Sequence, residues 1–332
     1  MTRTTSSRSI FSASVLGGLS ALLIVALGGM GCQNPFEPTP ILFKTEDWTY
    51  KGAKGLKLKS DRYEIYSTCK RKPFVEALPG FLETCYKAYD ELLPTETVPA
   101  EPLKTYLFKT RPQWERFTEE FSPRRAPTYK RIRRGGYSER GITVSHYSSQ
   151  RSTLSILAHE GLHQYLEITG RHQIPAWVNE GLACYFESFE LDGNNRPVFK
   201  PNMNTLRSPS LRKALAADSL IPLREVLATN AGIVVQGRSQ RVQSCYAQWW
   251  SLVLFLLQPS SSNRYSEGFG ELLDELGSEA MKRKANGYLA ADTDNTLSFG
   301  EAVFQAYITE DLETFESDYK KYLYKLLNLR TY

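Results

Sequence analysis

Short stretches in which apolar and polar residues alternate predict β-strands in the first half of the chain. Residues 63–66, 105–108 and 141–147 show this period of two. Between the strands, apolar residues recur every three or four positions over 75–93 and 113–121, and a proline follows each run. The folded part is therefore expected to begin near Trp48, with strands and helices mixed through residues 46–147.

The second half of the chain shows helical spacing almost throughout. Apolar residues repeat at intervals of three and four over 155–166, 177–187, 269–276, 281–289, 299–307 and 312–323. We expect residues 148–332 to form a mainly helical part. The helices near the C-terminus are interpreted as packing elements, because their apolar stripes explain their sequence without any chemistry.

The first residues predict export from the cell. Arg3 and Arg8 precede an apolar run over residues 15–27, which ends in the letters GGMGC at 28–32. A signal-peptide core has about 7–15 apolar residues and a membrane span about 20, so residues 1–31 are interpreted as a signal peptide. The small residues before Cys32 resemble a bacterial lipoprotein cleavage box. Cys32 would then be lipidated and would hold the protein at a membrane, in the periplasm or at the cell surface; the alternative is plain secretion with a free Cys32.

Residues 32–45 are expected to be a tether, since 33–40 contain three prolines. A hydrophobic content of 41% over the full chain suits one substantial core, and a net charge of +5 over 332 residues does not call for a nucleic-acid partner. Seven basic residues over 124–140 form either a solvated loop or a contact for an acidic substrate. Four more cysteines follow Cys32, and their spacing leaves disulfides and buried thiols both open: Cys69, Cys85, Cys184 and Cys245.

The sequence HEGLH at residues 159–163 predicts a metal site. His159 and His163 are four residues apart, so on a helix they lie on one face about 6 Å apart along the axis and can converge on one ion. Glu160 falls beside the histidines, about 100° round the helix from His159, where it could reach a metal-bound water rather than the metal. The chain has only four histidines, which makes this pairing hard to attribute to chance. His146 and His172 are interpreted as structural or surface residues.

Catalytic zinc needs a third protein ligand and an open fourth position. Glu180 is the best candidate, because it lies in a second helical pattern that begins after Pro175 and that a loop can fold back onto the first. Zinc lowers the pKa of a coordinated water, and Glu160 would take the proton as general base. Glu167 and Glu187 are fallback acidic residues, and Glu187 is expected to orient a ligand or to face solvent.

These two blocks, HExxH and NEGxAxYFE at residues 179–187, resemble the gluzincin metallopeptidases. The likeness is to an uncharacterised bacterial family of exported gluzincin-like domains and, more distantly, to the aminopeptidase N family, and it runs from about Gly135 to the C-terminus. It implies an α+β, zincin-like fold, with a small mixed or mostly antiparallel sheet over the active-site helix and a mainly helical C-terminal part. It also implies that residues 136–144 feed the edge strand that binds substrate.

The same resemblance gives Tyr246 two alternatives. It resembles the tyrosine that opens a helix and donates to the oxyanion, and it equally fits a core face with Trp249 and Trp250. The Gly-Ala-Met-Glu-Asn stretch of aminopeptidase N is absent upstream of His159, so aminopeptidase action is not implied.

Two functions follow from the sequence. The first is zinc-dependent hydrolysis of exported or envelope polypeptides, with one Zn²⁺ held by His159, His163 and Glu180. The alternative is a catalytically inactive zincin-fold module that binds or scaffolds at the cell envelope. No phosphate loop, dinucleotide fingerprint or serine-hydrolase elbow competes with these interpretations.

Overall fold

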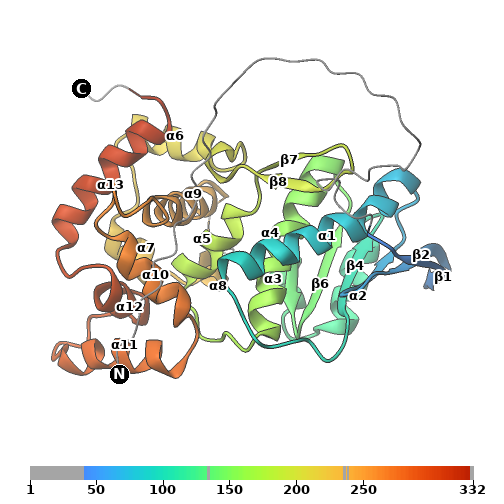
Figure 1. Ribbon diagram of the computed structural model, residues 1–332, viewed down its shortest axis with the longest axis horizontal. Coiled ribbons are helices and arrows are strands. Elements are labelled where there is room, and N and C mark those ends of the chain that lie inside the picture. Colours follow the sequence, from blue (N-terminus) through green and yellow to red (C-terminus); the bar gives the residue numbers. More distant parts are fainter. Residues whose placement is uncertain (1–40, 133–134, 235–236, 238, 330–332) are drawn as a thin grey trace, which may run out of the picture. The chain divides into compact units, whose positions relative to one another are not determined.

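The computed structural model of the protein describes residues 41–132, 135–234, 237 and 239–329 (Figure 1). The predicted signal peptide, Cys32 and most of the predicted tether lie outside these residues, as do Arg133 and Arg134 of the basic run. No helix among the described residues combines the length and apolar character that a membrane crossing requires.

Six strands form one mixed sheet in the order β1-β2-β3-β4-β6-β5. The strands are β1 (Lys44–Tyr50), β2 (Ala53–Lys59), β3 (Tyr63–Ser67), β4 (Leu103–Phe108), β5 (Gly136–Glu139) and β6 (Ile142–His146). Three of the five strand pairs are antiparallel, and β3–β4 and β4–β6 are parallel. The predicted α+β class, with a small mixed sheet before a mainly helical part, is confirmed.

The hairpin of β1 and β2 was not predicted. β1 begins at Lys44, inside the stretch 32–45 that the sequence assigns to a tether. Its register pairs Lys44 with Lys59 through to Tyr50 with Ala53, and the turn at Lys51 and Gly52 has positive φ at both residues. Most residues of β1 are exposed, so its sequence carries little of the alternation that marks a half-buried strand.

The central helix, α4 (Gln150–Ile168), lies against one face of the sheet. It packs on β5, on β6 and on α1 (Lys72–Leu92) (Figure 1). Twelve of its nineteen residues are buried, which fits a helix covered on several sides. Gly161 leaves room for Tyr89 of α1, whose hydroxyl donates to the Ala158 carbonyl at 2.6 Å. The position of α4 is therefore fixed by the sheet and by α1.

The opposite face of the sheet carries a smaller aromatic core. Phe108, Trp114, Tyr137 and Val144 are its buried residues, and Phe117 packs against them. Trp114 and Phe117 belong to α2 (Arg111–Phe121), which covers β4 and β6 on this side, and α3 (Ala126–Tyr129) follows it. Helices on both faces thus hold β5 and β6 in place beside α4.

The C-terminal half is mainly helical. After α5 (Ala176–Tyr185) come a hairpin of β7 (Phe189–Leu191) and β8 (Pro197–Phe199), the 3-10 turn η1 (Pro201–Met203), α6 (Ser208–Ala216), α7 (Leu223–Ala228), α8 (Ala231–Val234), α9 (Ser239–Leu256), α10 (Ser266–Asp274), α11 (Glu279–Ala291), α12 (Phe299–Tyr307) and α13 (Leu312–Leu326). The predicted helices near the C-terminus are confirmed. The prediction that Tyr246 opens a helix is wrong, because α9 begins seven residues earlier (246 − 239) and no proline or glycine interrupts that stretch.

α5 and α9 make a close crossing at Gly181, the residue after Glu180. A Cβ added there would lie 2.5 Å from a methyl group of Val253 and 2.6 Å from the Trp249 carbonyl oxygen. The two helices can therefore approach only because this residue has no side chain.

We expect Gly181→Ala to lower the free energy of unfolding by about 1–3 kcal/mol, because the helices must move apart. Chemical denaturation measures the effect. Gly287→Ala is the matched control in α11, where an added Cβ meets nothing within 4 Å, and it should stabilise by up to about 1 kcal/mol. Equal changes in both variants would contradict the close-crossing argument.

Candidate metal centre

The two motif histidines lie on one face of α4, and both side chains are almost fully covered. The side chain of Ser149 caps the helix by accepting from the Ser152 backbone N–H at 3.3 Å. His159 and His163 follow in successive turns, and their Nε2 atoms lie 3.2 Å apart. Helix α4 therefore delivers two imidazole nitrogens to one point, as the four-residue spacing predicts.

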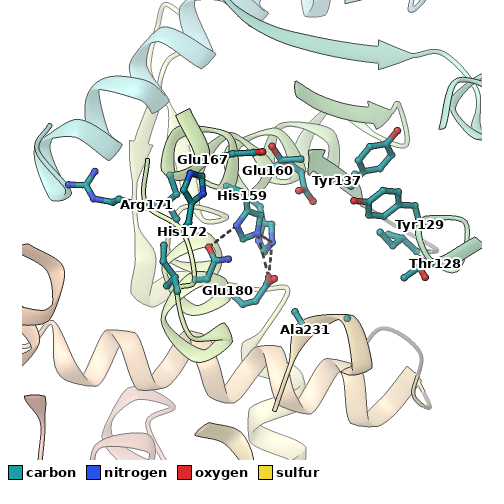
Figure 2. A pocket seen from close by; sticks show the side chains of 18 of the residues that line it. Thr128, Tyr129, Tyr137, His159, Glu160, Glu167, Arg171, His172, Glu180 and Ala231 are labelled. Atoms are coloured by element: carbon teal, nitrogen blue, oxygen red, sulfur yellow. Dashed lines mark hydrogen bonds and ion pairs between the residues drawn. The ribbon is translucent and has the colours of Figure 1, made fainter. Parts of the chain in front are cut away.

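Helix α5 brings Glu180 to the same point. Its Oε2 lies 3.3 Å from His159 Nε2 and 3.5 Å from His163 Nε2. Zinc bonds of about 2.0–2.1 Å in a tetrahedron place any two ligand atoms about 3.3 Å apart. The three sides of this triangle, 3.2, 3.3 and 3.5 Å, match that separation. Figure 2 shows Glu180 facing the ring of His159.

Each histidine is held at its other ring nitrogen by an acceptor. His159 Nδ1 lies 2.9 Å from Glu187 Oε1, and His163 Nδ1 lies 3.0 Å from Asn179 Oδ1. These partners place the proton of each neutral ring on Nδ1, so the Nε2 lone pairs face one another and the carboxylate. Glu180 Oε2 is buried without a hydrogen-bond partner. Three converging acceptors of this kind fit a divalent cation.

The charges around the three atoms lead to the same conclusion. Burial raises the pKa of Glu180, but the two histidines outweigh burial and hold the pKa well below its ordinary value. Burial lowers the pKa of His159, but Cys184, Glu180 and Glu187 outweigh burial and raise the pKa well above its ordinary value. The site thus attracts positive charge. The three distances between the ligand atoms are nearly equal, which fits one cation bound at the centre better than protons bound to the individual rings.

A second donor group lies behind His159. Atoms of His159, Cys184 and Glu187 are close enough to share an ion. However, Arg207 donates through Nε to Glu187 Oε2 at 2.8 Å and forms an ion pair with Oε1, so its guanidinium already neutralises this carboxylate. Burial also raises the pKa of the Cys184 thiol, which keeps it protonated. This group is a hydrogen-bonded support for His159, and the Glu180 triangle is the candidate metal centre.

Glu160 lies beside the triangle, on the side of the sheet edge. A Cβ added at Gly136 of β5 would lie 3.2 Å from Glu160 Cγ, so the glycine gives the carboxyl group its space. Burial raises the pKa of Glu160, and the two histidines partly offset this. A buried carboxyl with a raised pKa next to an open site has the properties of a general base.

The triangle opens into a cavity of about 430 Å³. Figure 2 shows Tyr137 of β5 on one side of His159 and Arg171 on the other. The cavity is lined by Thr128, Tyr129, Ile132, Gly136, Tyr137, Ser138, His159, Glu160, His163, Leu166, Glu167, Arg171, His172, Gln173, Ile174, Asn179, Glu180, Ala231, Gly232 and Tyr246. Three of the four residues of β5 are among them. Among the strands that the structure describes, β5 ends the sheet and pairs only with β6, so its outer edge runs along this cavity.

Tyr246 lies between the cavity and the core. It lines the cavity, with its ring centroid 6.3 Å from that of His159, and it also packs edge-on against Trp249 at 5.2 Å. The guanidinium of Arg207 lies over the ring at 4.8 Å. Burial raises the pKa of the hydroxyl well above its ordinary value, so the group stays protonated and can donate a hydrogen bond.

Of the other residues that the sequence analysis named, some lie at the cavity and some lie away from it. His146 lies in β6 and packs edge-on against Trp114 on the far face of the sheet, whereas His172 is exposed at the rim of the cavity. Glu167 lines the cavity and accepts from the Gly141 backbone N–H at 2.9 Å. Within the basic run, Lys130 pairs with Glu119.

All four cysteines in the described part of the chain are free buried thiols. Of the two possibilities that the cysteine spacing left open, disulfides or buried thiols, the structure therefore shows buried thiols. Their burial gives them the role of small apolar side chains.

Three supporting residues were missed by sequence reasoning. Asn179 precedes Glu180 directly, and its place in that motif was a usable signal. Asn204 donates to Glu187 Oε2 at 2.9 Å, and Arg207 binds both oxygens of the same carboxylate. Asn204 and Arg207 belong to no motif. They reach Glu187 only because the chain folds back through β7, β8 and η1, which the sequence does not show.

The comparison with protein families gives one match. A family described as "Protein of unknown function (DUF1570)" matches residues 153–272, which is less than half of the chain. The searches of curated proteins and of solved structures returned no match. The matched segment runs from α4 into α10 and contains the histidines, Glu160, Glu180, Arg207 and Tyr246. Over this segment, the chain is similar to a family whose description assigns no function.

Proposed function

We propose that this protein is a zinc-dependent peptidase of the zincin type that cleaves exported or envelope polypeptides. The observation that carries the proposal is the triangle of His159, His163 and Glu180, whose sides match the ligand separations of tetrahedral zinc. Three protein ligands leave the fourth position open toward the cavity, which is the arrangement of catalytic rather than structural zinc.

The residues around the triangle supply the remaining chemistry. Bound zinc would act as a Lewis acid that polarises a peptide carbonyl and makes water more acidic. Glu160 accepts the proton of the attacking water and passes it to the leaving amine. Tyr246 lines the cavity with its hydroxyl protonated, and this hydroxyl donates a hydrogen bond to the oxygen on which negative charge develops. Glu187 and Asn179 keep both imidazoles in the tautomer that binds metal.

The free edge of β5 supports a polypeptide as substrate. An unpaired strand edge offers a row of backbone donors and acceptors, and an extended peptide can add to it as one more strand. A Cβ added at Gly136, at the start of β5, would lie 3.2 Å from Glu160 Cγ, so a peptide paired with β5 would pass close to the base. Export, and attachment to a membrane through a lipidated Cys32, complete the proposal and rest on the N-terminal sequence alone.

Zinc content and hydrolysis of unfolded casein by the purified full-length chain test the proposal together. We expect about one zinc per chain by mass spectrometry and cleavage that a chelator stops and added zinc restores. Zinc at 100 times its Kd should also stabilise the fold by about 2.7 kcal/mol, because only the folded chain assembles the triangle.

The outcomes of this experiment separate the two functions. A chain that binds no zinc would refute the metal centre. A chain that holds zinc but cleaves neither casein nor any peptide of a broad library would instead be the inactive binding or scaffold module at the envelope.

A further inference from the structure

A second cavity adjoins the cavity of the metal centre. Its volume is about 470 Å³, and it shares Gln173 and Ile174 with the first cavity. Asn230 lines the second cavity and the next residue, Ala231, lines the first. The walls come from the start of α5, the end of α7, α11 and α12. In Figure 1, α11 and α12 lie on one side of α4 and β6 lies on the other. The two cavities therefore share part of their walls, and we call the pair the groove; the metal centre lies in the first cavity.

The chemistry of the second cavity is that of a peptide subsite. Apolar groups form much of its wall, and they come from Ile174, Pro175, Ala176, Leu227, Ala228 and Phe299. Three carboxamides, those of Gln173, Asn230 and Asn286, lie among the lining residues and are exposed. A carboxamide both donates and accepts, which matches the alternating N–H and C=O groups of a peptide backbone. The one cation, Lys282, is paired with Glu279 at 2.7 Å.

The second cavity is built on tightly packed backbone. A Cβ added at Gly300 would lie 2.1 Å from the Leu227 carbonyl oxygen, and one added at Gly277 would lie 2.7 Å from Arg171 Cα. Trp177 Nε1 donates to the Gly300 carbonyl at 3.1 Å. These contacts hold α5 and α7 against α12, and they hold the loop between α4 and α5 against the turn between α10 and α11. The cavity is thus formed before any ligand arrives, which lowers the cost of binding.

We propose that this protein is an endopeptidase, whose groove holds an extended polypeptide on both sides of the bond that is cut. One side of the substrate pairs with the edge of β5, and the other places an uncharged apolar side chain in the second cavity while its backbone bonds to the rim carboxamides. This inference rests on the proposed peptidase function and adds the substrate class to it.

The test compares substrate lengths with the zinc-loaded full chain. The probes are peptide libraries of four, eight and twelve residues, randomised in sequence and blocked at both ends. We expect kcat/KM to rise at least tenfold from the shortest to the longest library, with cuts at internal bonds. Ala228→Trp fills the second cavity from an exposed position, and it should remove that gain.

The matched control is Ala290→Trp, at an exposed position of α11 that does not line the cavity, and it should keep the full length dependence. Release of single terminal residues from unblocked peptides, or a length dependence unchanged in Ala228→Trp, would overturn the inference but leave a peptidase. Absence of cleavage at every length in the unmodified chain would instead refute the proposed function itself.

Discussion

Replacing Glu160 by glutamine is expected to lower kcat by about two to four orders of magnitude while the zinc content stays at one per chain. Glutamine keeps the shape of the side chain but cannot act as a base. Glu160 is not one of the three residues that supply the triangle of ligand atoms, so zinc binding should be kept. The measurement is single-turnover cleavage of casein, with zinc determined on the same sample. Loss of both zinc and activity would mean that Glu160 is a ligand and that the assignment of roles is wrong.

Stability provides a second measurement on the same variant. Burial raises the pKa of Glu160 above its ordinary value, so the folded state disfavours the charged form. At neutral pH, above the ordinary pKa, ionised Glu160 therefore costs stability, and a neutral glutamine removes that cost. We expect the thermal midpoint of Glu160→Gln without zinc to be no lower than that of the unmodified chain.

Glu167→Gln is the matched control for this variant. Glu167 also lies on α4 and lines the cavity, but its carboxylate accepts a backbone hydrogen bond from Gly141, which a glutamine oxygen can also accept. Its activity should stay within a few-fold of the unmodified chain. A collapse of activity in Glu167→Gln, with full activity in Glu160→Gln, would move the role of base to Glu167.

The parts of the centre that were predictable are those encoded by local spacing. His159 and His163 meet because four residues make about one helical turn, and this is independent of the rest of the fold. Glu180 required one further assumption, that the loop after α4 returns the chain to the histidines, and the structure brings it there. Two helical segments with polar residues at core positions, joined by a loop, can be recognised from the sequence, so this assumption was open to prediction.

The supporting residues depend on long-range packing instead. Arg207 meets Glu187 only because β7, β8 and η1 form a hairpin and turn of their own between the two residues. The second cavity needs four helices that are distant in sequence, and the edge position of β5 depends on the strand order β4-β6-β5. The exposed β1 was missed for another reason, since a strand with few buried residues shows no alternation.

Arg207→Met is expected to lower the free energy of unfolding by about 3–5 kcal/mol, because it leaves the buried Glu187 carboxylate without its cationic partner. Burial alone would raise the pKa of Glu187, but Arg207 and the hydrogen bond from His159 lower it to about 2. Urea denaturation measures the loss. Since Glu187 also holds His159 Nδ1, we expect zinc affinity to fall by about 10–100-fold.

The same substitution should also change how the free energy of unfolding depends on pH in the acid range. The pKa of Glu187 is lower in the folded chain than its ordinary value of 4.5, so its ionisation stabilises the fold above that value. This contribution is lost as the pH falls from about 4.5 toward about 2. Arg207→Met should begin to unfold at a higher pH than the unmodified chain, because its Glu187 protonates earlier.

Arg224→Met separates this effect from the loss of any arginine. Arg224 pairs with Glu301 at 3.4 Å, but its side chain is 68% exposed, against 19% for Arg207. A solvated pair of this kind contributes about 1 kcal/mol or less, so the control should unfold near the unmodified chain. Arg207→Lys keeps the charge without the two-pronged geometry and should fall between the two. If Arg207→Met matched Arg224→Met in both stability and zinc affinity, Glu187 would not depend on Arg207, and the support assigned to His159 would have to come from Asn204 alone.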